Sequence, residues 1–218
     1  MEVKPLAGLT RTLRVLLKIS IAITATAVVT GFYNYYSYAN IPPGVDPNET
    51  LLPSDVVNSI VGLIQVVLAI ILGITFLRWI YRTNKNLRTL SGEQMTFTPG
   101  WSVGWYFVPI ANLFKPYQAM KEIWHISHKN ESTTYSLVGW WWCLWIVSNF
   151  PVDSYIASTM AFIVSDGLNV ILNIVALMLV TRIGMAYSKN IVEPTGVAHG
   201  DSADAPLSPT EIVRSGEF

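Results

Sequence analysis

The 218-residue sequence is poor in charged side chains, which make up 13% of its residues, against about 25% in a typical soluble domain. It has one cysteine, Cys143, and this excludes an intrachain disulfide and any CxxC metal or redox motif. Its three histidines match no HExxH or other zinc spacing, and no GxGxxG or Walker A pattern occurs. No nucleophile–base pair or metal-ligand set is recognisable, so the sequence predicts a protein that is not an enzyme and that has no cofactor and no metal site.

Hydrophobic residues, in contrast, make up 51% of the chain and include eight Trp and ten Tyr. The mean hydropathy is +0.41. A helix needs about 20 mostly apolar residues to cross the hydrocarbon core of a bilayer. We therefore predict an all-α integral membrane protein with four transmembrane helices in a domain of residues 15–190. The predicted spans lie at about 15–36, 56–80, 136–152 and 157–181.

Polar segments flank and separate the predicted spans. Residues 1–14 form a basic N-terminus, and residues 37–55 form a proline-rich loop. Residues 191–218 form an acidic tail for which we predict disorder. The first span also resembles a cleaved signal peptide, because Ala25–Ala27 mimics a cleavage site. Its length and the tyrosine-rich stretch 33–38 favour a true span that ends in an aromatic belt.

The stretch TPGWSVGWYFVPIANLFKPYQAM (residues 98–120) is largely apolar and aromatic, but its mostly apolar run, Trp101 to Phe114, is too short to cross a bilayer. If it does not cross, all 14 Lys and Arg residues fall on one side of the membrane, which the positive-inside rule makes cytoplasmic. If it crosses, the basic residues from Lys115 onward move to the other side. We therefore predict that residues 98–128 lie at the cytoplasmic face of the cell (inner or plasma) membrane and that both termini are cytoplasmic.

Two structures fit the segment of residues 98–128: an interfacial helix that packs beneath the bundle, or a broken, re-entrant helical element that lines a site. Pro109 interrupts helical hydrogen bonding, and Gly100 and Gly104 offer a smooth face for the close approach of another helix. An amphipathic helix follows from Pro116. Its predicted apolar face consists of Tyr117, Met120, Ile123 and Trp124.

A long motif runs through FLRWIYRTNKNLRTL (residues 76–90) and FTPGWSVGWYFVPIANLFKPYQAMKEIW (residues 97–124). It combines an arginine-rich helix end with PGW, a GW pair, FVP, AN and a basic residue before PYQ. Its members here are Pro99, Gly100, Trp101, Gly104, Trp105, Pro109, Asn112, Lys115, Pro116, Tyr117 and Gln118. This motif resembles a bacterial multi-pass membrane family known as domain of unknown function 4328. The family has no assigned activity, so the resemblance implies a class of protein and no catalytic residue.

Asp166 is the one carboxylate deep in a predicted span, nine residues in from Ala157. A charge at this depth is costly and is by default a functional hypothesis. Asn169 and Asn173 follow on the same helix face, and Gln65 lies at a similar depth in the second span. We predict that these residues form an intramembrane polar site. Two roles fit it: hydrogen bonds that join the helices, which a protonated Asp166 also makes, or a proton or cation site.

Other polar and aromatic side chains have simpler interpretations. The tryptophans within Trp140–Trp145 are predicted to be lipid-facing or interfacial anchors, with a stacking pocket for a ring-shaped ligand as the alternative. His125 and His128 are predicted to be solvated surface residues rather than metal ligands. Glu122 is expected to pair with its neighbours or with solvent. Asp46, Glu49 and Asp55 fit a weak calcium site, and a plain solvated loop with prolines explains them equally well.

The leading functional hypothesis is a non-catalytic membrane component: a scaffold, regulator or complex subunit. Its expected partners are the lipid bilayer and a protein that binds either the basic cytoplasmic surface (residues 78–129) or the C-terminal tail. Nothing in the sequence indicates binding of nucleic acid. The alternative is a small proton- or cation-coupled transporter or channel-like protein that uses Asp166.

Overall fold

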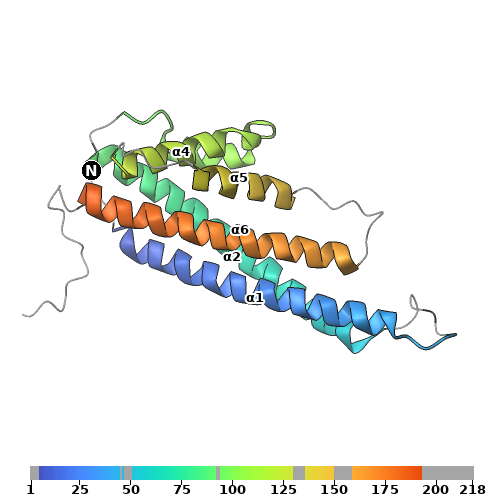
Figure 1. The fold of residues 1–218 in the computed structure, drawn as a ribbon. Coiled ribbons are helices and arrows are strands. Elements are labelled where there is room, and N and C mark those ends of the chain that lie inside the picture. The colour runs from blue at the N-terminus through green and yellow to red at the C-terminus, as the bar shows by residue number, and fades with distance from the viewer. Residues whose placement is uncertain are drawn as a thin grey trace, which may run out of the picture.

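The computed structural model describes residues 5–44, 46, 51–91, 94–129, 136–149 and 159–192. Within these residues the chain forms helices joined by turns and no strand, which confirms the all-α fold class. Three long helices make up the main bundle: α1 (Ala7–Ala39), α2 (Pro53–Leu90) and α6 (Thr159–Tyr187). Helix α1 packs against both α2 and α6 (Figure 1).

Each of these three helices is long and apolar enough to cross a membrane. Among the described residues, no other helix meets both conditions. Helix α1 has 33 residues and α2 has 38. At about 1.5 Å per residue, both exceed the roughly 30 Å of a hydrocarbon core. The helices extend beyond the predicted spans, since α2 continues from Ile80 to Leu90 as a packed helix and α1 already begins at Ala7 within the predicted N-terminal segment.

The predicted count of four membrane-spanning helices is not confirmed. Helix α5 (Ser136–Asn149), which covers most of the predicted third span, has 14 residues. That corresponds to about 21 Å of helix, which is short of a hydrocarbon core. The remaining residues of that prediction, 150–152, lie outside the described residues, as do residues 193–218 of the predicted tail. Ile191 and Val192, which we assigned to the tail, are buried in a helical turn, Ser188–Val192.

The two ends of the bundle differ in charge. Helix α1 runs opposite to α2 and α6, so one end holds the start of α1 and the ends of the other two (Figure 1). We call this end the basic end. Its basic residues on α2 and α6, including the turn after α6, are Arg78, Arg82, Lys85, Arg88, Arg182 and Lys189. The opposite end, where Asp55 begins α2, we call the acidic end.

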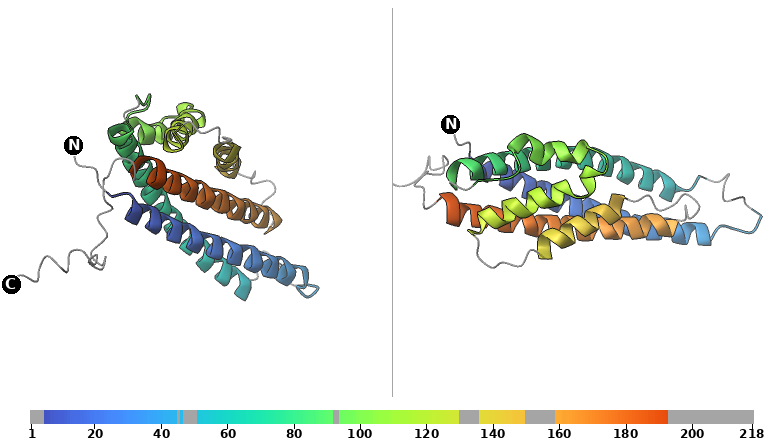
Figure 2. Two further views of the ribbon diagram at one scale, coloured as in Figure 1. Left: turned by 60° about the vertical axis from the view of Figure 1, so that its left-hand side comes forward. Right: turned by 90° about the horizontal axis from the view of Figure 1, so that it is seen from above.

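Shorter helices form a second layer on one side of the bundle, toward the basic end (Figures 1 and 2). They are α3 (Pro99–Gly104), two 3₁₀ turns, η1 (Trp105–Phe107) and η2 (Ala111–Leu113), then α4 (Lys115–Ser127) and α5. The predicted break lies between η1 and η2, where the N–H of Ala111 donates to the carbonyl of Pro109 over 2.7 Å. Ile110, between them, has φ 66° and ψ −53°, the rare and strained geometry of a γ-turn.

Glycine allows α1 and α6 to approach closely at two places. A Cβ added at Gly31 would meet Cγ1 of Ile163 at 2.8 Å. A Cβ added at Gly184 would meet Cγ2 of Thr10 at 3.0 Å. Small residues at such contacts let membrane helices gain dispersion energy from backbone proximity. The α1–α6 pair therefore depends on a glycine near each of its ends.

Burial is concentrated at the basic end. The side chains of Leu13, Trp79, Leu87, Trp124 and Ile183 are at most 1% exposed. The middle of α2, in contrast, presents apolar side chains outward, and these are Ile60, Leu63, Val66, Val67, Ile70 and Ile74. An apolar helix surface of this length requires lipid or another protein around it.

Candidate functional site

A cavity of about 660 Å³ lies between the long helices and the second layer. Its polar lining comes from all three long helices and from the end of α5: Ser20, Thr24, Gln65, Ser148, Asn149, Asp166, Asn169 and Asn173. Aromatic side chains of α2, η1 and α5 form much of the remaining wall: Phe76, Tyr106, Phe107, Trp141 and Trp145. The four residues of the predicted intramembrane site all line this one cavity.

The central pair of the site joins α2 to α6. Nε2 of Gln65 donates a hydrogen bond to Oδ1 of Asp166 over 3.0 Å. Asp166 has no ion-pair partner among the described residues. The carboxyl group is half-buried beside a neutral amide, so a cation or a proton is the group that would neutralise its charge.

The other predicted polar residues differ in how they are used. Nδ2 of Asn169 donates to the carbonyl of Ser165 one turn earlier, over 2.9 Å. The amide of Asn173 has no hydrogen-bond partner within the described chain, although it lines the cavity. Two threonines of α1 that were not part of the predicted site also differ: Thr24 is buried at the cavity wall, whereas Thr26 is exposed and donates to the carbonyl of Ala22. Among the four predicted residues, Asn173 and Asp166 therefore have the most capacity left for a ligand.

Tyr106 is a cavity residue that sequence reasoning missed. Its hydroxyl is fully buried and has no hydrogen-bond partner among the described residues. Its ring lies edge-on to Trp142 and Trp145, with centroid distances of 6.5 and 6.3 Å. A tyrosine hydroxyl is ordinarily protonated at neutral pH, and burial raises the pKa of the Tyr106 hydroxyl further, so it remains a neutral donor. Its position inside the family motif, between Trp105 and Phe107, was the available signal.

The prediction for the tryptophans was wrong for two of them. Trp140 is 66% exposed, as expected of an anchor, but Trp141 and Trp142 are 3% and 5% exposed. Trp142 stacks on Trp145 at 4.7 Å, and its Nε1 donates to the carbonyl of Leu113 over 3.1 Å. These rings are buried because Trp141 packs against Phe76 of α2 and Trp142 packs against Tyr106 of η1.

The family motif builds the start of the second layer. The side chain of Thr98 caps α3 by accepting from the N–H of Trp101 over 3.3 Å. The rings of Trp101 and Trp105 pack at 4.6 Å. Nζ of Lys115 lies 6.0 Å from the Trp105 ring centroid and 5.9 Å from that of Phe97, at the outer range for cation–π attraction.

The expected smooth face of Gly100 and Gly104 is not used by another helix. A Cβ at Gly100 would meet nothing within 4 Å, and one at Gly104 would meet the ring of Trp101 at 3.2 Å. The reason is that α3 has only six residues and turns Gly100 outward.

The sequence of residues 100–104 also matches the GxSxG pattern, but Ser102 is fully buried and its hydroxyl donates to the carbonyl of Pro99. It therefore lacks the exposed hydroxyl of a catalytic serine.

Three polar side chains fasten residues 95–97 to the helices on either side. Nδ2 of Asn84 donates to the carbonyl of Phe97 over 3.0 Å, and Arg88 donates to the carbonyl of Met95 over 2.6 Å. The carboxylate of Glu122 accepts from the N–H groups of Thr96 and Phe97. The expectation that Glu122 pairs with its helix neighbours or solvent was wrong, because these loop N–H groups lie within its reach. We call this set of contacts the latch.

The predicted apolar face of α4 is confirmed, since Met120, Ile123 and Trp124 are at most 1% exposed. His128, expected on the surface, is instead 8% exposed. Its ring stacks on that of Trp124 at 4.2 Å, and its Nδ1 lies 2.8 Å from the Trp124 carbonyl. It is buried because α4 ends against the bundle. The described residues contain no cluster of three or more His, Cys, Asp or Glu that would hold a metal.

A second polar cluster closes the acidic end. The Asp55 carboxylate accepts from the N–H of Leu52 (2.9 Å), from Nδ2 of Asn34 (2.8 Å) and from the hydroxyl of Tyr38 (3.0 Å). Asn34 also donates to Ser54 over 3.1 Å. The Asp55 carboxylate therefore caps α2 and joins it to α1, a structural role that neither the calcium nor the solvated-loop interpretation included.

Three helices of membrane-spanning length, arranged around a cavity with a half-buried carboxylate, are typical of a membrane-embedded helical protein. Within that class, residues 45–186 match the family described as Domain of unknown function (DUF4328), and the chain belongs to this family. The match confirms the resemblance carried by the motif between α2 and α4. No curated protein and no solved structure matches the chain.

Proposed function

We propose that this protein is a multi-pass, non-enzymatic component of the cell membrane that acts as a scaffold, regulator or complex subunit through its second layer. An outward-facing apolar surface on that layer carries the proposal. Its side chains are 42% to 78% exposed, and they are Trp101, Phe107, Ile110, Leu113 and Phe114. Large apolar groups gathered on so short a stretch are typical of a surface that meets a partner or a membrane. We call this set the apolar surface.

The latch supports this role because it holds the apolar surface in a fixed position. Asn84 and Arg88 connect residues 95–97, which precede the second layer, to α2 by hydrogen bonds. Glu122 connects the same residues to α4. Hydrogen bonds to charged groups contribute about 1.5–3 kcal/mol each. A pre-positioned surface loses little conformational entropy when a partner binds.

The path of the chain favours four passages through the membrane. Nδ2 of Asn190 donates to the carbonyl of Ser127 over 3.3 Å, so α4 ends beside the end of α6. Ile163, near the start of α6, lies against Gly31 in the last third of α1. The chain between α4 and α6 therefore travels the length of the bundle, and α5 is the described helix on that path. We propose that α5 is the described part of a fourth passage.

The charge distribution favours a cytoplasmic basic end, since Lys and Arg are retained on that side. Both chain termini then lie in the cytoplasm.

The cavity lining bears on the depth of η1 in the membrane. Tyr106 and Phe107 line the same cavity as Gly73 and Phe76, which precede the first basic residue of α2, Arg78. This favours a shallow re-entrant placement of η1 over a helix that lies flat on the surface.

The test of the scaffold proposal is co-purification in mild detergent from native membranes. We expect a stoichiometric partner with the parent chain and a loss of most of that partner with Phe114→Ser. Phe162→Ser is the matched control, because Phe162 is 68% exposed on α6, outside the second layer, and Phe114 is 59% exposed. Equal retention by both variants, or a parent chain that functions as a clean monomer, contradicts the proposal.

A second candidate function is proton- or cation-coupled transport, which the Gln65–Asp166 pair favours. The carboxyl group faces a cavity of about 660 Å³ and has no basic partner among the described residues. Polar residues inside membrane helices commonly mark ion or proton pathways. The hydroxyl of Tyr106 and the amide of Asn173 add neutral groups to the same cavity wall.

Flux into vesicles that contain the purified chain tests this second candidate. Asp166→Asn keeps the shape and an acceptor for Gln65 but removes the titratable carboxyl. We expect this variant to lose a pH-dependent flux while its amount in the membrane stays unchanged. A flux equal to that of the parent chain eliminates transport through Asp166.

A further inference from the structure

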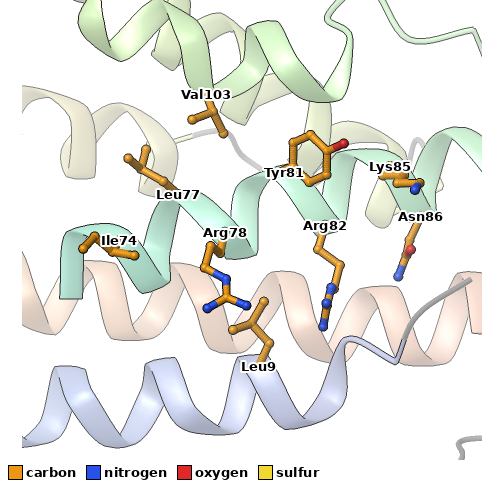
Figure 3. Close-up of a pocket in the computed structure, with 9 residues that line it drawn as sticks. All are labelled: Leu9, Ile74, Leu77, Arg78, Tyr81, Arg82, Lys85, Asn86 and Val103. Carbon is orange, nitrogen blue, oxygen red and sulfur yellow. The ribbon is translucent and has the colours of Figure 1, made fainter. Parts of the chain in front are cut away.

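A groove of about 460 Å³ runs along α2 at the basic end, between α1 and α3 (Figure 3). Helix α2 contributes most of its lining, with Leu9 from α1 and Val103 from α3 on the two sides. Three of its lining side chains, Arg78, Arg82 and Lys85, are cationic. The groove is separate from the cavity around Asp166, although Leu77 lines both.

The three cations share one face of α2, because they are spaced four and three residues apart. In Figure 3 the guanidinium groups of Arg78 and Arg82 both extend from α2 toward α1. Arg82 makes one long hydrogen bond, 3.4 Å, to the carbonyl of Pro5. Arg78 and Lys85 have no hydrogen-bond or ion-pair partner within the described residues. Like charges on one helix face repel when no counter-ion lies beside them, and a bound anion relieves this repulsion.

No described carboxylate is placed to serve as that counter-ion. Glu122, at the basic end, accepts from the N–H groups of residues 96 and 97. Asp46 and Asp55 lie at the acidic end, and Asp166 pairs with Gln65 inside the bundle. The positive charge of the groove is therefore not neutralised by the described part of the chain.

The other half of the groove is apolar and lies toward the membrane. Ile74 and Leu77 precede Arg78 along α2, and Leu9 and Val103 complete the apolar walls. Val56 to Leu77 contains no charged residue and corresponds to about 33 Å of helix. That length matches a hydrocarbon core of roughly 30 Å and places Arg78 at its boundary. The groove thus changes from apolar to cationic where a phospholipid changes from acyl chain to phosphate.

We propose that this groove binds one anionic phospholipid, with its phosphate on Arg78, Arg82 and Lys85 and an acyl chain along Ile74 and Leu77. The inference rests on the proposed membrane placement and names a specific lipid partner for the basic end. Guanidinium groups suit this role because their planar donors match phosphate oxygens two at a time. Juxtamembrane cations also gain from the negative potential of anionic lipid.

The experiment measures lipid binding to the full chain in detergent by native mass spectrometry. The probes are phosphatidylglycerol, phosphatidylcholine, soluble glycerol phosphate and a peptide of residues 193–218. The groove variant carries Arg78→Gln, Arg82→Gln and Lys85→Gln. The control variant carries Lys115→Gln, Lys121→Gln and Lys129→Gln, which remove the same charge outside the groove.

We expect one phosphatidylglycerol to bind in preference to phosphatidylcholine, and the groove variant to weaken this binding about tenfold or more. The control variant should change it less than about threefold. A third variant, Arg78→Lys with Arg82→Lys, keeps the charge and should lose an intermediate share of the affinity. Circular dichroism checks that each variant remains helical.

Three results overturn the proposal: equal weakening by the groove and control variants, displacement of the lipid by soluble glycerol phosphate, or binding of the acidic peptide in place of the lipid. A failure of this kind is distinct from a failure of the proposed function. Membrane insertion and partner retention are measured separately, and neither depends on which lipid the groove selects.

Discussion

Gln65 donates a hydrogen bond to Asp166 across 3.0 Å, and this contact joins α2 to α6. The two residues are 101 positions apart in the chain. The contact lies at the wall of a cavity that Asn173 and Tyr106 also line. The same geometry serves a structural bridge and a cation site. What separates the two roles is whether function survives when the hydrogen bond is kept and the charge is removed.

The energy of this bridge is measurable by a double-mutant cycle with Gln65→Leu and Asp166→Leu. Hydrogen bonds between membrane helices contribute about 0.6 kcal/mol on average and at most about 1.7 kcal/mol. We expect a coupling free energy in this range from unfolding in mixed detergent. Additive effects of the two substitutions would mean that the contact does not stabilise the bundle.

Replacing Gly184 by Leu should separate α1 from α6. A Cβ at this position would lie 3.0 Å from Thr10, and overpacking of this kind costs about 1–3 kcal/mol. The midpoint of thermal unfolding in detergent should fall accordingly. Gly62→Leu is the matched control, since a Cβ there meets nothing within 4 Å. Equal destabilisation by both substitutions would argue against close α1–α6 packing.

Removing the Glu122 carboxylate should open the latch without unfolding the bundle. Glu122→Ala leaves the N–H groups of Thr96 and Phe97 without their acceptor, and an unsatisfied buried N–H costs about 1–3 kcal/mol, less where the group is only part-buried, as that of Phe97 is. We expect faster hydrogen exchange at these two amides and unchanged exchange in α6. Gln118→Ala, an exposed position on the same helix, should leave both rates as they are. Unchanged exchange in Glu122→Ala would refute the latch.

Asp55→Ala should weaken the acidic end. The carboxylate accepts three hydrogen bonds there, including the one that caps α2. Loss of an N-terminal cap costs about 0.5–2 kcal/mol, and the donors on α1 lose their acceptor as well. Ser59→Ala is the control, because its hydroxyl only bonds back to the Asp55 carbonyl within α2. A stability of Asp55→Ala equal to that of the control would show that the cluster is not structural.

Sequence reasoning found the helices but not where they end. The hydropathy of α2 falls after Ile80, so the predicted span stopped there, yet the helix continues to Leu90. The added turns are helical because Thr83, Asn84 and Leu87 pack beneath the second layer. Hydropathy detects contact with lipid, and it does not detect a polar helix that is covered by protein.

For the candidate site, too, the sequence predicted some of the residues and missed others. Depth along each helix placed Asp166 and Gln65 at a similar level, and both line the cavity. Tyr106 lines that cavity from a segment for which the sequence left two placements open, interfacial or re-entrant. Trp141 was predicted to be a lipid-facing or interfacial anchor but is 3% exposed. Helical periodicity tells which residues share a face, but the partner of that face depends on the packing of the whole chain.

The sequence by itself determined the class of this protein, because long uncharged apolar stretches and an asymmetric distribution of Lys and Arg follow from composition and order alone. It also determined the family, through the motif between residues 76 and 124. Only the tertiary structure decided that Gln65 meets Asp166, that Glu122 holds the loop before α3, and that three cations share a groove with Leu9 and Val103. Those relations join residues far apart in the chain, and local periodicity carries no information about them.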